Sequence, residues 1–415
     1  HGAVKKPRRL RPRTPEDCPY CGDEHASTCH PMVRLRRPPI PYKERKSRRG
    51  RPKEKQTEGY CCWNQVCEYW GIRNAEVHAL VGDGHHGKNE SIQDYQCQWC
   101  GCRISERKGK VMYGLKTVTA KVAMVLIGLG EGVDLAAAER IFGHGGETIR
   151  RWLTRAGMHS EGVHEEYMVD MESEHVQLDE LKVNMKGLKN QWLWVAIEAN
   201  SKILLSLQVG PRKQWVAHAL VHSLVGIMAP GYVPLYTSDG LAMYFYALTA
   251  HYGSYQELEG KRKPHWVVSE LLQYAQMKKH RVWRKLKRIE IRVLCGEREA
   301  IKERLVSMGL RATVQTSFVE RVNLTLRQSV AGLARRTWSQ NVMTSELEIH
   351  LSWYQAYYHF CRGHQSLRTE YTFTNQAGVL IQRYRKRTPA MAAGWTRHHW
   401  SVSELIMYPL PPAMS

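Results

Sequence analysis

The spacing of the cysteines constrains this chain more than any other feature of its sequence. Nine of the eleven cysteines lie between residues 18 and 102, and only Cys295 and Cys361 fall outside this stretch. Disulfide frameworks also cluster, but closely paired cysteines in a basic chain without a secretion signal are typical of metal ligands. We therefore expect short zinc-stabilised modules in the first quarter of the chain, where few residues are available to build a hydrophobic core.

The clearer of two candidate metal sites lies in residues 60–110, where we predict a zinc ribbon. Two cysteine pairs with the spacings C-x4-C and C-x2-C are separated by 29 residues, so two knuckles could offer four thiolates to one tetrahedral ion. The predicted ligands are Cys62, Cys67, Cys97 and Cys100. Cys61 could replace Cys62, and Cys102 could replace Cys100. No His or carboxylate with an open position is evident, which favours a structural zinc ion over a catalytic one.

Residues 1–59 are predicted to form a basic arm with a second, smaller zinc knuckle. Its candidate ligands are Cys18, Cys21, His25 and Cys29. His30 competes with His25 for the fourth position, and a free Cys29 is the alternative to a metal site. The first 60 residues carry 17 Lys and Arg against 7 Asp and Glu, which is also the composition of a solvated linker. Such an arm can still neutralise DNA phosphates without folding.

The charge of the whole chain points to a polyanionic partner. Its 61 Lys and Arg exceed its 39 Asp and Glu, for a net charge of +22. Nucleic acid and an acidic membrane surface are the two obvious partners for such a chain. The longest apolar run, residues 122–129, is far below the roughly 18 residues of a transmembrane helix, and no apolar segment follows the basic N-terminal residues. We therefore expect no membrane span and no secretory signal.

Residues 111–160 carry the pattern of a helix-turn-helix domain. A first helix is predicted to end at Gly143, a turn contains Gly145 and Gly146, and a second helix follows. The outer face of that second helix carries the candidates for contacts with DNA phosphates or base edges, which are Thr148, Arg150, Arg151 and Arg155. The alternative is an amphipathic pair of helices with a solvated basic face.

From residue 174 the pattern changes to that of a mixed α/β domain. The segments HVQLDELKVNM, QWLWVAIEA and KILLSLQVG are short, rich in β-branched and aromatic residues, and bounded by turn residues, as consecutive strands would be. A helical segment, the buried strand VPLYTSD and a second helical segment follow. We therefore predict a multidomain α/β chain in which zinc modules and a helical domain precede a mixed-sheet domain at 174–345. Residues 346–415 are expected to form a helical tail.

Three acidic residues stand out by their positions in this last domain. Asp179 lies within a predicted strand, Asp239 follows a buried strand, and Glu320 lies one turn into a helix. Such positions can converge at one edge of a mixed sheet, where like charges are costly without a cation. Two Mg²⁺ or Mn²⁺ ions would offset that cost and could stabilise the attacking and leaving oxygens of a phosphoryl transfer.

Each of these acids alone also has a structural interpretation. Asp179 could lie in a turn, Asp239 could cap the end of its strand, and Glu320 could form a surface salt bridge. Glu180 is a direct rival of Asp179, and the two-residue period of a strand places their side chains on opposite faces.

Several motifs resemble those of one known family. LDELKV, TSDG and especially TSFVERVNLTLRQ followed by RRTWS resemble the DDE transposases of bacterial insertion sequences. The closest likeness is to the group with a zinc ribbon and a helix-turn-helix ahead of an RNase H-like catalytic domain, since CCWNQVCEYWGI and YQCQWCGCRIS look like that ribbon. WYQAYYHFCRGHQSLR, RTPAMAAG and HHWSVSELI are similar to the family's tail. The resemblance covers roughly residues 60–408, and FVERVNLTLRQ is its most specific part.

The resemblance implies roles for individual residues. Asp179, Asp239 and Glu320 match the three metal-binding acids of the family. Asn323 and Arg327 would lie on the same side of the helix as Glu320 and could contact DNA near the metal ions. Two further matches without a defined role are Arg362 and His364.

Two parts of the chain depart from the family pattern. The 80 residues between the second and third acids include a basic block from Lys261 to Arg288 and imply an insertion at about 254–310, whose fold the sequence does not reveal. The first cysteine cluster and its basic arm lie outside the resemblance.

By this resemblance, the chain would hydrolyse a phosphodiester at each transposon end and join the freed 3′-hydroxyl to target DNA. It would use two Mg²⁺ or Mn²⁺ ions and structural Zn²⁺, bind terminal inverted repeats and target DNA, and act as a homodimer or higher oligomer. A bacterial cytoplasmic, nucleoid-associated protein is expected. The alternatives are a zinc-dependent DNA-binding regulator derived from a transposase and a metal-dependent nuclease on the same fold.

Overall fold

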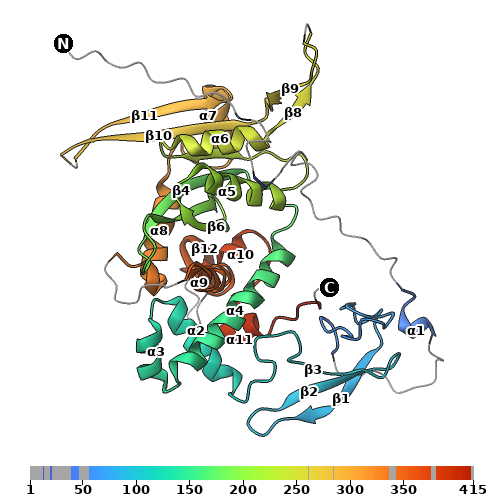
Figure 1. Ribbon diagram of the computed structural model, residues 1–415. Helices are drawn as coiled ribbons and strands as arrows, with labels where there is room; N and C mark the ends of the chain where they lie inside the picture. Colours follow the sequence, from blue (N-terminus) through green and yellow to red (C-terminus); the bar gives the residue numbers. More distant parts are fainter. Residues whose placement is uncertain are drawn as a thin grey trace, which may run out of the picture. The chain divides into compact units, whose positions relative to one another are not determined.

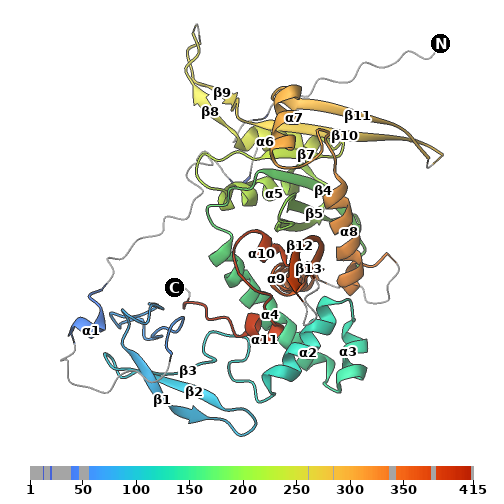
Figure 2. The ribbon, with the colours of Figure 1, turned by 180° about the vertical axis from the view of Figure 1, so that it is seen from behind.

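A computed structural model describes most of the chain and divides it into two compact units. The described residues are 13, 19–20, 39–45, 56–259, 261–283, 285–335, 343–374 and 380–412. The first unit contains His1–Pro31, Glu165–Leu351 and Arg362–His399. The second unit contains Met32–His164, Ser352–Cys361 and Trp400–Ser415. Figures 1 and 2 show the elements of both units from opposite sides.

The second unit begins with a small β-sheet module. A short helix α1 (Tyr42–Arg45) is followed by the antiparallel strands β1 (Leu80–His86), β2 (Ile92–Cys97) and β3 (Arg103–Ser105), in the order β1-β2-β3. Its small buried core contains three of the cysteines beside Tyr69, Leu80 and Tyr95. So few apolar residues give little burial energy, which is the situation in which a bound metal usually stabilises the fold.

Three helices follow in the second unit. They are α2 (Thr119–Gly130), α3 (Leu135–Phe142) and α4 (Gly146–Tyr167), of which the last three residues belong to the first unit. The Asp134 side chain caps α3 by accepting from the Ala137 N–H, and Gly143 ends it with a left-handed φ of 69°. The predicted helix, glycine turn and second helix are therefore present as a structural pattern.

The C-terminal segments of the second unit pack on these helices. The π-helical turn η4 (Tyr357–Cys361) and helix α11 (Val402–Ile406) each contact α2. Trp353 is fully buried and donates its indole N–H to the carbonyl of Leu126. Phe360 stacks on Trp400, with ring centroids 4.4 Å apart. The contact between Trp353 and Leu126 joins residues 227 positions apart in the sequence.

A six-stranded mixed sheet forms the centre of the first unit. Its strands are β4 (His175–Val183), β5 (Gln191–Glu198), β6 (Leu204–Pro211), β7 (Leu235–Ser238), β10 (Gln273–Val282) and β11 (Lys285–Cys295), in the order β11-β10-β7-β4-β5-β6. β7 is parallel to both β4 and β10, and the other neighbours are antiparallel. The mixed α/β class and the mixed sheet predicted from the sequence are confirmed.

Helices cover both faces of this sheet. One face packs on α5 (Gln214–Ile227) and α6 (Ala242–His251) through buried residues such as Val176, Leu178 and Trp194 (Figure 1). The other face packs on α7 (Arg298–Ser307), through Leu235 and Met277, and on α8 (Ser317–Ser329), which is followed by the 3-10 turn η3 (Ala331–Leu333) (Figure 2). Successive residues of β4 therefore point toward different helices.

The segment at 254–310, whose fold the sequence left open, is built mostly of strands. A small hairpin of β8 (Gly253–Gln256) and β9 (His265–Val268) precedes β10, β11 and α7. Part of the segment belongs to the central sheet, because residues 273–276 of β10 pair directly with β7. Beyond residue 276, β10 pairs only with β11 among the described strands, and the hairpin extends past the end of β7.

The C-terminal region differs from the helical tail expected for residues 346–415. Helix α9 (Thr344–Ala356) leads to the antiparallel hairpin of β12 (His364–Thr374) and β13 (Leu380–Arg387), and then to the one-turn helix α10 (Pro389–Ala392). Both strands of the hairpin are rich in charged and polar residues, so they lack a clear apolar period by which the sequence could have indicated strands. No helix among the described residues is long and apolar enough to cross a bilayer.

Candidate functional site

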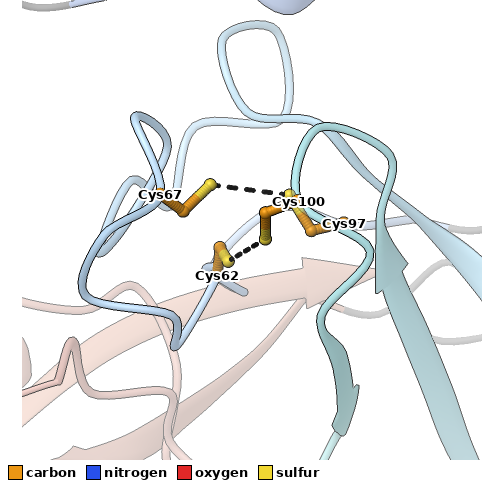
Figure 3. Close-up of side chains that lie close together, drawn as sticks. All are labelled: Cys62, Cys67, Cys97 and Cys100. Carbon is orange, nitrogen blue, oxygen red and sulfur yellow. Dashed lines mark hydrogen bonds between the residues drawn. The ribbon is translucent and has the colours of Figure 1, made fainter.

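The structure brings the four cysteines of the predicted ribbon together. One sulfur from each of Cys62, Cys67, Cys97 and Cys100 lies within 4.8 Å of all the others (Figure 3). The Sγ atoms of Cys62 and Cys100 are 3.5 Å apart, and those of Cys67 and Cys97 are 3.9 Å apart. A tetrahedral ion with Zn–S bonds of about 2.3 Å would hold its sulfurs roughly 3.8 Å apart. The donor set and its spacing therefore fit a structural zinc ion.

The backbone around these cysteines forms two tight turns. The Gly71 N–H donates to the carbonyl of Cys62, and the Gly101 N–H donates to that of Cys97. Gly71 and Gly101 have φ values of 74° and 73°, a left-handed conformation that favours glycine. Each turn presents a pair of sulfurs in the same direction.

The two alternatives considered for this cluster lie outside it. Cys61 is buried elsewhere, and burial raises the pKa of its thiol to about 11. The Cys102 thiol donates to the carbonyl of Arg103 and does not belong to the group of four sulfurs. Within the cluster, the side-chain hydrogen bond from Cys62 lowers the pKa of Cys97 to about 5. The other predicted knuckle, formed by Cys18, Cys21, His25 and Cys29, lies outside the described residues.

A carboxylate cluster occupies one edge of the six-stranded sheet. One oxygen from each of Asp179, Glu180 and Asp239 lies within 4.8 Å of the others. The register pairs Leu178 with Ser238, so Asp179 and Asp239 occupy the next level, where β7 has ended. Because β7 ends there, side chains from both faces of β4 reach the same space. This explains how Glu180, on the face opposite to Asp179, joins the cluster.

Glu180 is held by the helices on its own face. The Tyr244 hydroxyl donates to Glu180 Oε2 at 3.0 Å, and Arg212 forms an ion pair with Oε1. The Glu180 side chain is only 3% exposed. Its carboxylate is therefore neutralised by the protein itself, which separates its role from that of Asp179.

Helix α8 approaches the cluster from the other face. Asn323 donates from Nδ2 to Asp179 Oδ2 at 2.8 Å, and its amide oxygen is buried without a partner among the described residues. Glu320, one turn earlier, is not within the group of three carboxylates. It accepts a hydrogen bond from the Thr316 hydroxyl at 2.6 Å and forms an ion pair with Lys279 of β10. The negative charge of Glu320 still contributes to raising the pKa of Asp179.

Burial and like charge shift the proton equilibria of this cluster. Burial, followed by repulsion from Glu180 and Asp239, raises the pKa of Asp179 to about 7. Burial, and then repulsion from Asp239, raises the pKa of Glu180 to about 7. Carboxylates so placed favour a bound cation, and their hard oxygens suit Mg²⁺ or Mn²⁺. Asn323, which donates to Asp179, has an amide oxygen that is buried without a hydrogen-bond partner among the described residues.

The remaining residues predicted to contact DNA fall into two groups. Arg151 is exposed, Thr148 is half-buried, and Arg150 is exposed with an ion pair to Glu147 at 2.9 Å. Arg155, by contrast, donates to the carbonyls of Val111 and Tyr113.

Near the end of α8, Arg327 donates to the carbonyls of Lys182 and Leu333. Arg362 donates to the Ser329 hydroxyl, and His364 is hydrogen-bonded to Ser366. The side chains of Arg155 and Arg327 thus donate to backbone carbonyls of other segments. Arg151 is exposed to solvent.

Sequence reasoning did not identify Lys279, Arg212 and Tyr244 as neighbours of the acids. Nothing in their local sequence marks them, since each reaches the cluster from another element. Neither models of known protein families nor the sequences of characterised proteins match this chain. The assignment of the carboxylate cluster as a candidate site therefore rests on its geometry.

Proposed function

We propose that the chain is a DNA transposase of the DDE type with an RNase H-like catalytic domain. The observation that carries the proposal is the meeting of Asp179 and Asp239 at one sheet edge, although 60 positions separate them in the sequence. Helix α8 supports it further, because its Asn323 donates to Asp179 and the charge of its Glu320 helps to raise the pKa of Asp179, although Glu320 itself lies outside the group of three carboxylates. The motifs that resemble the transposase family contain these same residues.

In this proposal, Asp179, Asp239 and Glu320 would hold two Mg²⁺ or Mn²⁺ ions. Such ions lower the pKa of a water or hydroxyl nucleophile and stabilise the charge that develops on the phosphate. Asn323 orients the Asp179 carboxylate through its 2.8 Å hydrogen bond. Lys279 forms an ion pair with Glu320, and Glu320 would have to leave this ion pair to hold an ion. Glu180 forms an ion pair with Arg212 and accepts a hydrogen bond from Tyr244, and these contacts hold β4 in position beside α5 and α6.

The second unit would select the DNA. The cysteine cluster, with Zn²⁺, would stabilise the ribbon, and α4 would present Thr148, Arg150 and Arg151 to the terminal inverted repeat. The net charge of +22 supports binding to end and target DNA. A dimer or higher oligomer would bring two ends together, and such a protein would work at the bacterial nucleoid.

The decisive test is divalent-ion-dependent cleavage and joining. The purified chain would be incubated with Mg²⁺ or Mn²⁺, a duplex from the DNA flanking its coding region, and a target plasmid. We expect 3′-hydroxyl ends and their covalent joining to the plasmid. Asp239→Asn and Asp179→Asn should retain end binding but lower cleavage at least about 100-fold, the scale seen when one electrostatic group leaves an active site.

Asp170→Asn is the matched control, because Asp170 is exposed and lies outside the cluster. Its cleavage should equal that of the unaltered chain. End binding without cleavage would instead favour a transposase-derived regulator. Cleavage without joining would favour a nuclease on the same fold.

A further inference from the structure

The first unit contains a cationic pocket that the proposed chemistry does not use. Its volume is about 640 Å³, and it lies between the β5–β6 turn, α8 and β12. Its described lining includes the cationic side chains Lys202, Arg321 and Arg368 and the imidazole of His364, over an apolar floor of Phe318 and Val322. None of its described lining residues is acidic. A pocket of this size accommodates a small organic ligand, and its charge requires that ligand to be an anion.

Lys202 is buried in this pocket, in a turn that neighbouring groups hold in place. It is only 7% exposed and has a left-handed φ of 65°, a strained conformation for a residue with a side chain. The Glu198 carboxylate fixes the turn by accepting from the Asn200 N–H at 3.0 Å and from Ser201. The Lys202 ammonium donates to the carbonyl of Ala199 and lies 3.2 Å from the centroid of the Phe318 ring. Strain of this kind persists where the surrounding structure enforces it, often at binding sites.

Two arginines complete the charge around the buried lysine. Arg321 lies on α8 immediately after Glu320, and its side chain is exposed. Arg368, on β12, lies over the ring of Tyr384 at 4.3 Å from its centroid. After burial, the positive charges of Lys202, Arg362 and Arg321 lower the pKa of His364. The pocket therefore gathers positive charge without an acidic residue in its lining, and the Glu198 carboxylate acts on Lys202 from outside that lining.

We propose that this pocket binds one nucleotide of a DNA strand. Lys202, Arg321 and Arg368 would contact its phosphate, because charge-assisted hydrogen bonds from Lys and Arg suit phosphate oxygens. The deoxyribose would lie on the apolar floor. DNA is favoured over free phosphate because Arg321 and Val322 of the pocket lining directly precede Asn323 on α8, and Asn323 donates to Asp179 of the carboxylate cluster. In this respect the inference rests on the proposed function.

The test compares the salt dependence of DNA binding in matched variants of the full chain. Each phosphate contact contributes about 0.9 to the slope of log affinity against log salt concentration on duplex DNA. Without added divalent ions, we expect Lys202→Met and Arg321→Gln each to reduce that slope by about one contact. The double variant should lose little more than either single variant, because both side chains contact the same phosphate.

The controls remove the same charges elsewhere. Lys186→Met and Arg311→Gln alter exposed residues outside the pocket and should leave the slope unchanged. Lys202→Arg should restore the slope, and Arg368→Gln, at an exposed strand position, carries the test if Lys202→Met fails to fold. Equal effects of pocket and control variants, or full additivity in the double variant, would overturn the proposal.

A second arm distinguishes DNA from free phosphate. Inorganic phosphate is titrated into the full chain while the ¹³C-labelled ring of His364 is observed by NMR, with His364→Gln to assign the signal. We expect a shift that Lys202→Met abolishes. The same shift with an unchanged DNA slope would make this a free-phosphate site and refute the nucleotide proposal. If the chain binds DNA but the pocket variants leave the salt slope unchanged, the nucleotide proposal for the pocket fails and the proposed function stands. If the chain binds no DNA, the proposed function fails.

Discussion

At the scale of single residues, the carboxylate cluster is a place where the protein accepts an electrostatic cost. Asp179 has a pKa near 7 in the folded chain, against an ordinary value of 3.8. Between these pH values the folded state holds more protons than the unfolded state. The contribution of Asp179 to the free energy of unfolding is therefore complete below about pH 4 and is lost as the pH rises to about 7. A bound divalent cation would remove this cost.

This predicts a pH-dependent effect of Asp239→Asn in the absence of divalent ions. Removing one like charge relieves repulsion on Asp179, so the variant should gain about 1 kcal/mol of stability at pH 8, roughly the value of one pKa unit. The gain should be much smaller at pH 5, where Asp179 is already protonated. Asparagine keeps the side-chain oxygen that accepts from the Leu241 N–H. Urea denaturation at the two pH values measures the difference.

Asp170→Asn serves as the control and should show no such pH dependence. Added Mn²⁺ should raise the stability of the unaltered chain but not that of Asp239→Asn. The same stability difference at pH 5 and pH 8 would contradict the electrostatic account of the cluster.

At the scale of elements, the arginines of α4 differ in their contacts. Arg151 is exposed, while Arg155 donates to the carbonyls of Val111 and Tyr113 at 3.3 and 2.6 Å. Sequence spacing alone placed both on one DNA-binding face. The contacts of Arg155 instead anchor the segment that connects the ribbon to α2.

We therefore predict different outcomes for two similar substitutions in α4. Arg151→Gln should weaken DNA binding and reduce its salt slope by about one phosphate contact, with unchanged stability. Arg155→Gln should lower the free energy of unfolding by about 0.5–1.5 kcal/mol, because the carbonyls of Val111 and Tyr113 lose a charged donor. Affinity measurements at several salt concentrations and urea denaturation test the pair. A stable Arg155→Gln with a reduced slope would show that both arginines contact DNA.

The β1–β3 module allows an equally sharp comparison between neighbouring cysteines. Cys100→Ser should abolish zinc binding and lower the thermal transition of the second unit, because three thiolates and a hydroxyl hold zinc poorly. Cys102→Ser is the matched control, two positions away and outside the sulfur cluster. Zinc content by atomic spectroscopy and thermal denaturation give the answer. Equal zinc content in the two variants would show that Cys100 is not a zinc ligand.

At the scale of the whole molecule, the two units separate the two candidate sites. The sulfur cluster lies in the second unit, and the carboxylate cluster lies in the first. Chain segments pass between the units several times, since residues 352–361 and 400–415 return to the second unit. Each unit is therefore assembled from distant parts of the chain, although each has its own core.

This division predicts that Cys62→Ser damages recognition more than metal-ion binding at the acids. The variant should lose specific binding to the transposon end, because the ribbon no longer folds around zinc. Mn²⁺ should still raise the stability of the first unit, as it does in the unaltered chain. Gel-shift and thermal-denaturation experiments measure the two effects. Normal end binding by Cys62→Ser would exclude the zinc ribbon as a recognition module.

The sequence alone determined features that depend on residues close along the chain. Cysteine spacing indicated which sulfurs form two pairs, because a tight knuckle needs only a few residues. Apolar periodicity and the residues at helix ends indicated α3, the turn and the start of α4. Strand-like segments indicated β4 to β7, and the alternation within β4 placed Asp179 and Glu180 on opposite faces.

Only the tertiary structure decided which of these elements pair with one another and which side chains come into contact. The pairing of β10 with β7, the extension of β10 beyond it and the ion pair between Lys279 and Glu320 join residues tens of positions apart. Glu180 reaches Asp239 because β7 ends one level earlier. Such contacts depend on strand order and register, which arise from packing the whole sheet and leave no periodic signal in the local sequence.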